Sequence, residues 1–153
     1  MGENRLGTYG GNIMPTDEEL RKMEDTGNCF ACGQNNPIGM KLDFKIISNQ
    51  YIAKTTVDKN YQSFGGVVHG GIVSTMLDEA MGGYLFKTGE PAFTGKLEIR
   101  YRKPTPVGMP ITIRGWVENR KRNVVEMKSE IILEDGSISA EGYAKMVVVK
   151  TVE

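Results

Sequence analysis

The chain has 153 residues, which is enough for one compact domain with its own core and too few for two. Its 19 Lys and Arg residues balance 19 Asp and Glu residues, so no overall charge would draw the protein to nucleic acid or to an anionic membrane. The polar, glycine-rich residues 2–11 contain no apolar run typical of a signal peptide or membrane span, and we therefore expect a cytoplasmic protein.

The first predicted element is a short helix within an N-terminal extension, residues 1–27. Thr16 and Glu19 have the spacing of a capping box, and the acidic residues at 17–19 favour the positive end of a helix dipole. We expect this helix to end by Gly27. Residues 28–153 then form the main domain.

Cys29 and Cys32 form a C-x-x-C pair at the start of that domain. A tetrahedral zinc site takes four ligands, and the chain has no other cysteine and a single histidine, so we expect no metal site. A thioredoxin-like redox pair would open a helix, whereas the turn-forming residues 33–39 follow here. The two thiols are therefore predicted to lie in a structural turn.

Two alternating stretches, residues 40–48 and 51–58, predict an antiparallel strand pair that turns at Asn49 and Gln50. The apolar stretch from residue 72 to about 86 is too long for a strand and predicts a helix buried on most of its sides. Four long strands are expected after it, at residues 92–103, 111–122, 124–133 and 138–149.

The last predicted strand indicates how the sheet is arranged. Small and apolar residues alternate there with Ser139, Glu141 and Lys145, which is typical of a sheet with one face on the core. One helix followed by four strands joined by short turns favours an antiparallel sheet over βαβ units. The expected fold is therefore α+β, with an antiparallel sheet wrapped around one long central helix.

The sequence His69-Gly70-Gly71 directly precedes the predicted central helix. The start of a helix leaves backbone N–H groups without intrahelical partners, and these groups carry partial positive charge. Paired glycines let a substrate oxygen approach that backbone closely. Such a place can hold the oxyanion that forms when an acyl carbonyl is attacked.

Asp78 lies two helical turns further on, and no Lys or Arg stands three or four residues from it. A carboxylate in apolar surroundings is a better base near neutral pH, a common arrangement in active sites. Glu79, about 100° further round the helix, is the alternative catalytic group. Gly70 and Asp78 are about 12 Å apart along a helix, so both reach one carbonyl only if they come from two chains of a two-fold dimer.

Residues 66–80, GVVHGGIVSTMLDEA, resemble the H-G-G-x6-D signature of hotdog-fold acyl-CoA thioesterases, the family that includes the phenylacetic-acid-pathway enzymes. Residues 29–40 are similar to the C-x-x-C-G…N-P-x-G segment of one branch, and residues 97–104 resemble the strand that follows the helix. The resemblance covers about residues 28–150. It implies a homodimer or a dimer of dimers, and no cofactor.

The resemblance also implies roles for individual residues. Asp78 would be the nucleophile or general base, the Gly70 amide would polarise the carbonyl, and Thr94 on the next strand would assist the aspartate. Ser63, with Gln62 beside it, stands where many relatives place a second carbonyl donor. His69 is expected to fix its loop or to contact the substrate carbonyl. The sequence leaves open whether Asp78 activates water or attacks directly.

The expected substrate is an acyl-coenzyme A. Its acyl group is predicted to contact the backbone of Gly71 and the apolar side chains of Phe64, Met76 and Met81. The phosphates of coenzyme A require Arg or Lys, for which the candidates are Arg100, Arg102, Lys103 and the basic residues at 120–122. The alternatives are a non-catalytic acyl-CoA sensor and an enoyl-CoA hydratase on the same fold.

Overall fold

The computed structural model describes residues 27–149. The helix expected from Thr16 lies outside the described residues. No helix within residues 27–149 is both long enough and apolar enough to cross a bilayer. The elements, in chain order, are β1 (Lys45–Ile47), β2 (Gln50–Thr56), the 3-10 helix η1 (Lys59–Tyr61), α2 (Gly70–Lys87), β3 (Ala92–Tyr101), β4 (Pro110–Lys121), β5 (Val124–Leu133) and β6 (Ile138–Val148).

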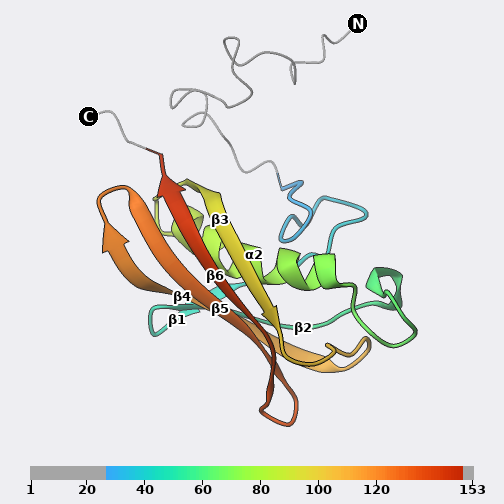
Figure 1. The fold of residues 1–153 in the computed structure, drawn as a ribbon. Helices are drawn as coiled ribbons and strands as arrows, with labels where there is room; N and C mark the ends of the chain where they lie inside the picture. Colours follow the sequence, from blue (N-terminus) through green and yellow to red (C-terminus); the bar gives the residue numbers. More distant parts are fainter. Residues whose placement is uncertain (1–26, 150–153) are drawn as a thin grey trace, which may run out of the picture.

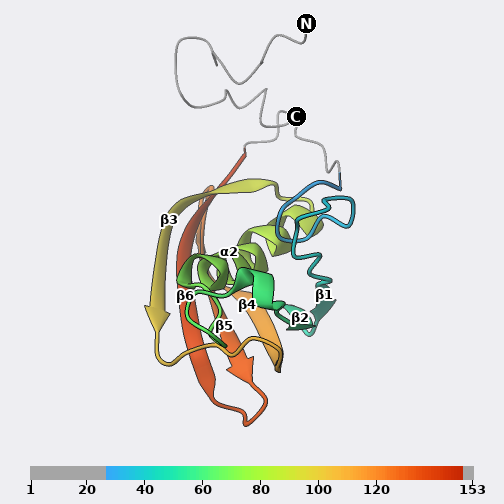
Figure 2. The ribbon, with the colours of Figure 1, turned by 90° about the vertical axis from the view of Figure 1, so that its right-hand side faces the viewer.

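The strands form a single antiparallel sheet in the order β1-β2-β4-β5-β6-β3. The sheet curves around α2, which lies across its concave face (Figure 1) and contacts strands β2 to β6. Seen from the side, β3 lies on one side of α2, and β1 and β2 lie on the other (Figure 2). The predicted fold class, an antiparallel sheet wrapped around one central helix, is confirmed.

Helix α2 packs on the sheet through six buried side chains, those of Val73, Met76, Leu77, Ala80, Met81 and Leu85. Their spacing of three and four residues places them on one face of the helix. The helix ends in a Schellman motif: Gly89 has a φ of 83°, its N–H donates to the Phe86 carbonyl, and the Glu90 N–H donates to the Leu85 carbonyl. Asp78 and Glu79, between these buried positions, are partly buried.

A glycine in β4 allows the helix to lie very close to the sheet. A Cβ atom at Gly115 would collide with the backbone carbonyl of Ala80, in the middle of α2. Gly115 is therefore required by the separation of the two elements and not by a special backbone conformation, since its φ is not positive. The contact fixes the position of α2, and with it the direction of Asp78.

The strand predicted at residues 40–48 is reduced to β1, Lys45–Ile47. The backbone before it bonds to the cysteine turn, because the Met40 N–H donates to the Phe30 carbonyl and the Leu42 N–H to the Ala31 carbonyl. These bonds replace a strand ladder. The hairpin turn after β1 lies at Ser48 and Asn49, one residue earlier than expected, and both have positive φ angles, as a type I′ turn requires.

The alternation predicted for the last strand is confirmed, except at Ser139. This residue was expected on the solvent side of β6, but it is fully buried. Its hydroxyl shares a hydrogen bond of 2.8 Å with Thr105, and its carbonyl accepts the N–H groups of Arg102 and Lys103. The loop after β3 therefore covers this end of the outer face, which the alternation of one strand does not reveal.

Candidate active site

The residue before α2 caps the helix and leaves a single N–H group of its first turn without a partner. The Gly71 N–H donates to Nδ1 of His69 at 2.9 Å, and the N–H groups of Ile72 and Val73 both donate to the His69 carbonyl. Gly70 is the first helical residue and has no intrahelical partner. Among residues 27–149, no group accepts a hydrogen bond from its N–H.

His69 therefore has a defined place in the loop. Its N–H donates to the Tyr61 carbonyl at 2.9 Å, which ties the loop to η1. Because its Nδ1 accepts a hydrogen bond, a neutral His69 ring carries its proton on Nε2. These two bonds join His69 to η1 and to the first turn of α2.

Tyr101, at the end of β3, contacts the same helix terminus. Its hydroxyl donates to the Gly70 carbonyl at 2.8 Å and lies 2.8 Å from the Ser74 hydroxyl. The ring is 54% exposed, so the contact is open to solvent in the protomer. The sequence reasoning did not single out Tyr101 or Ser74. Nothing in the local pattern marks them, because the contact joins residues 27 positions apart.

Asp78 and Thr94 are brought together across the gap between α2 and β3. The Thr94 hydroxyl donates to Oδ1 of Asp78 at 2.8 Å. The pairing of β3 with β6 shifts between Thr94 and Lys96, at Gly95. Such a bulge turns the side chains beside it and is frequent near active sites. Thr94 therefore faces the aspartate from an irregular point of the strand.

Glu79, the alternative catalytic group, points to a different part of the molecule. Oε2 of Glu79 lies 4.0 Å from Sγ of Cys29. The pKa of the Cys32 thiol is raised well above its usual range, first by burial, then by a hydrogen bond and negative charge from Glu79, and also by Cys29. Asp78 faces β3 and Glu79 faces the cysteine turn, so the two neighbouring carboxyl groups belong to different sites.

Among residues 27–149, Cys29, Cys32 and Glu79 are the one group of three potential metal ligands that come together. The expectation of no metal site considered ligands from cysteine and histidine alone. In the structure, the carboxylate of Glu79 joins the two thiols as a third potential ligand. It lies near the cysteines because α2 packs beside their turn.

The residues expected to contact the acyl group lie in contrasting settings. Phe64 is 82% exposed at the tip of the loop before α2. The loop is tightly turned there, because the Ser63 N–H donates to the Val67 carbonyl, and the Val67 N–H donates to the Phe64 carbonyl. Met76 and Met81 are completely buried and pack within the protomer core. They would reach an acyl chain only if that core opened around it.

Two parts of the chain hold the basic residues proposed for phosphate binding. Arg102 pairs with Glu141 at 2.9 Å, whereas no ion pair is found for Arg100 or Lys103 in the described part of the chain, and both side chains are exposed. At the β4–β5 hairpin, Arg120 binds both carboxylate oxygens of Glu90. Near the end of β3, Arg102 is therefore held in an ion pair, whereas Arg100 and Lys103 form none with a described residue.

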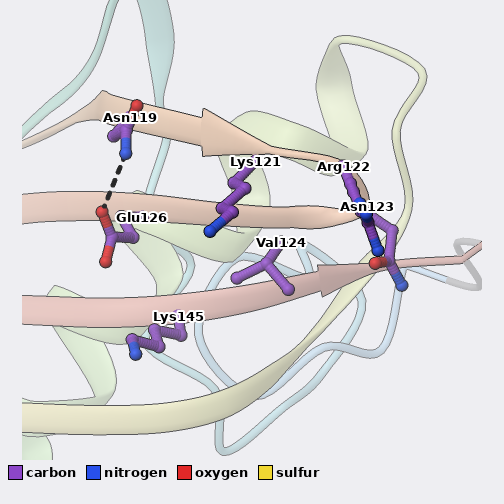
Figure 3. A pocket seen from close by; sticks show the side chains of 7 residues that line it. All are labelled: Asn119, Lys121, Arg122, Asn123, Val124, Glu126 and Lys145. Carbon is purple, nitrogen blue, oxygen red and sulfur yellow. Dashed lines mark hydrogen bonds between the residues drawn. The ribbon is translucent and has the colours of Figure 1, made fainter.

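A hollow of about 420 Å³ lies beside the β4–β5 hairpin (Figure 3). Its lining includes the cations Lys121, Arg122 and Lys145, together with Glu126. Asp78 and Gly70 do not line it. The hollow is therefore separate from the aspartate and the helix terminus.

Gly70 and Asp78 cannot act on one carbonyl within a protomer. Eight residues of helix separate them, which corresponds to about 12 Å. The Gly70 N–H and the Asp78 carboxylate therefore lie at different points along α2.

The family model of the Thioesterase superfamily matches residues 65–140, which include α2 with Gly70 and Asp78. The comparison with curated proteins gives no match. The fold is similar to that of a solved thioesterase superfamily protein, with a TM-score of 0.74 and 24% identity over 78% of this chain. The chain spans about 60% of that protein's length.

Two further solved structures share the fold. One is a hypothetical thioesterase from Streptococcus pneumoniae TIGR4 with coenzyme A, with a TM-score of 0.67 and 21% identity over 73% of this chain and 88% of that one. Variants of the Streptococcus protein were solved in which a threonine or an aspartate is replaced, and those two positions are 16 residues apart. The other is the PaaI protein of the E. coli phenylacetic acid degradation operon, with a TM-score of 0.64 and 18% identity over 69% and 82% of the two chains.

Proposed function

Because the chain belongs to the thioesterase superfamily and has the hotdog fold, we propose that it hydrolyses the thioester of an acyl-coenzyme A to a free acid and coenzyme A. The observation that carries the proposal is the hydrogen bond of 2.8 Å from Thr94 to Asp78. It orients a partly buried carboxylate that no described Lys or Arg neutralises through an ion pair. Asp78 and Thr94 are 16 positions apart in this chain. The aspartate and the threonine that were replaced in the Streptococcus variants are also 16 positions apart.

Asp78 drives the first step in this proposal. Oδ1 is engaged by Thr94, so Oδ2 removes a proton from water while the water oxygen bonds to the thioester carbon. The carbonyl oxygen becomes negative in the tetrahedral intermediate. Collapse of that intermediate breaks the carbon–sulfur bond, and the leaving thiolate takes up the proton. In the alternative route, Asp78 attacks the carbonyl directly, and water then hydrolyses the anhydride.

The N–H of Gly70 is the proposed donor to the negative oxygen. The other N–H groups of the first turn already have acceptors, so within residues 27–149 Gly70 alone offers a free donor at the positive end of the helix dipole. The Tyr101 hydroxyl donates a hydrogen bond to the Gly70 carbonyl and so fixes the peptide plane between Gly70 and Gly71. Ser63 and His69 border the same loop and complete the proposed carbonyl site.

Two copies of the chain are needed to place Gly70 and Asp78 at one carbonyl. A two-fold dimer with antiparallel α2 helices brings the Gly70 N–H of one protomer to Asp78 of its partner, and it creates two equivalent sites. Strand β3 supports such contact, because it is a ten-residue edge strand with Leu97 37% exposed and Tyr101 54% exposed. Long edge strands with apolar side chains readily pair with another chain.

The ligand assignment rests on the Streptococcus pneumoniae relative solved with coenzyme A. In our proposal, exposed Phe64 and the Gly71 backbone contact the acyl group, with Met76 and Met81 behind them. Arg100, Arg102 and Lys103 would meet the phosphates of coenzyme A, because Arg and Lys are the side chains that recognise phosphate. The cytoplasm, where acyl-CoA is made and used, is the proposed location.

Replacing Asp78 with Asn tests the function directly. We expect turnover of an acyl-CoA panel, followed as free thiol, to fall at least about a hundredfold, the scale of losing a general base. Asp43→Asn is the matched control, since Asp43 is exposed and lies before β1, and it should retain wild-type turnover. Wild-type turnover in Asp78→Asn would end the assignment. Enoyl absorbance recorded in parallel would reveal a hydratase.

The two chemical routes differ in where solvent oxygen appears. A single turnover in oxygen-18 water puts the label only in the released acid if water attacks the thioester. If Asp78 attacks directly and water then cleaves the anhydride at the aspartyl carbonyl, the same single turnover puts the label in Asp78. Mass spectrometry of the peptide that contains Asp78 therefore distinguishes the water route from the anhydride route.

A further inference from the structure

Three metal-binding side chains converge on the side of α2 that faces away from β3. Sγ of Cys29 lies 4.0 Å from Oε2 of Glu79, and the ligand atoms of Cys29, Cys32 and Glu79 all lie within 4.8 Å of one another. We propose that these three side chains bind one Zn²⁺ ion, which fastens the cysteine turn to the central helix. The proposal is independent of the thioesterase chemistry.

The ligand set suits zinc by type and by distance. Two thiolates and a carboxylate are ligands that the borderline-soft Zn²⁺ ion accepts, and a water molecule takes the fourth tetrahedral position. Zinc–sulfur bonds of about 2.3 Å and zinc–oxygen bonds of about 2.1 Å place tetrahedral ligand atoms roughly 3.5–3.8 Å apart. The ligand atoms therefore need to move together by about 1 Å at most, which side-chain rotation supplies.

The backbone of the turn holds both cysteines on the same side. The Gly33 N–H donates to the Cys29 carbonyl at 2.9 Å, and the Asn35 N–H donates to the Gly27 carbonyl at 2.9 Å. A Cβ atom at Gly33 would collide with the backbone of Cys29 and Gly27. The glycine directly after the second cysteine is therefore needed for the turn to close.

A glycine on the helix makes room for the third ligand. A Cβ atom at Gly83 would lie 3.1 Å from Oε1 of Glu79 and 2.8 Å from the ring of the buried Tyr51. A glycine in the middle of a helix costs about 1 kcal/mol relative to alanine. Gly83 is thus an unfavourable choice for the helix alone, and its missing Cβ leaves space for the Tyr51 ring and for the Glu79 carboxylate.

The cluster is open on one side, which gives an ion a route in. Cys29 is exposed, whereas Cys32 and Glu79 are partly buried. In Figure 2, the blue-to-cyan segment that follows residue 27 lies beside α2, on the side opposite β3. Cys29 and Glu79 are 50 positions apart, so a bound ion would cross-link two distant parts of the chain.

Cobalt provides a readout that does not depend on activity. We expect the reduced, chelator-treated full chain to bind one Co²⁺ ion, with a near-ultraviolet thiolate-to-cobalt band and the visible bands of a tetrahedral site. One equivalent of Zn²⁺ should remove these bands and raise the Tm by several degrees. Glu79→Gln should weaken Co²⁺ affinity at least tenfold, with exposed Glu98→Gln as the matched control.

Other results would overturn the proposal. A folded wild-type chain that gives no thiolate-to-cobalt band has no such site. A Glu79→Gln variant with unchanged affinity means that the carboxylate is not a ligand. A stoichiometry of one ion per two chains means that cysteines of two protomers share the metal. Cys32→Ser should lose the thiolate-to-cobalt band, and Cys29→Ser provides a second test if Cys32→Ser does not fold. Circular dichroism checks that each variant is folded.

Discussion

The hydrogen bond between Thr94 and Asp78 makes a quantitative prediction. Thr94→Val keeps the shape of the side chain and removes the donor that holds Oδ1 of Asp78. Hydrogen bonds to charged groups contribute about 1.5–3 kcal/mol. At about 1.4 kcal/mol per factor of ten in rate, we expect kcat to fall by roughly 10- to 150-fold.

The assay is thiol release at saturating acyl-CoA, and Thr94→Ser is the matched control. The serine retains a hydroxyl and should keep most of the wild-type kcat. The valine variant should remain folded with a Tm close to wild type, since Val is favourable in a strand. If Thr94→Val turned over within about twofold of wild type while Asp78→Asn was inactive, Thr94 would not orient the aspartate.

Two further predictions concern stability. Gly115→Ala should lower the free energy of unfolding by about 3 kcal/mol, the upper end for overpacking, because the new Cβ meets the fixed backbone of Ala80. Urea denaturation measures this loss. Gly65→Ala is the control, because a Cβ at Gly65 meets nothing within 4 Å. A hydrogen bond from Arg120 is the main cause that lowers the pKa of Glu90. The ionised pair therefore stabilises the fold above the unfolded pKa, and this contribution disappears as the pH falls through the lower folded value. Arg120→Gln should cost under about 1 kcal/mol at pH 7 and progressively less as the pH falls through the folded pKa of Glu90, and a loss that does not change with pH would contradict an electrostatic origin.

The order of the elements was predictable from the sequence because it rests on local periodicity. The helix expected from residue 72 to about 86 is α2, Gly70–Lys87, and the strand expected at residues 124–133 has those bounds. The strand expected at residues 40–48 was too long, since part of it bonds to the cysteine turn. These hydrogen bonds form between two separate segments of the chain. An alternating pattern within one segment does not predict them.

The geometry of the candidate site was predictable in part for the same reason. The H-G-G sequence and Asp78 lie close together in the chain, and their spacing indicates a helix terminus with a carboxylate two turns away. The bulge at Gly95, the contact of Tyr101 with Gly70 and the approach of Glu79 to the cysteines all depend on tertiary packing. In particular, whether Asp78 or Glu79 faces Thr94 follows from the rotation of α2 on the sheet.

The contact of Gly115 with Ala80 sets that rotation and limits how this scaffold can change. Any larger residue at position 115 would push α2 away from β4, and the helix would carry its carboxylate away from Thr94. Loops at the rim, such as the one that presents Phe64, have no comparable constraint, because Phe64 is 82% exposed. If the chain hydrolyses acyl-CoA as proposed, new acyl specificities should arise by substitutions and insertions in the rim loops, while the helix and strand beneath them keep their register.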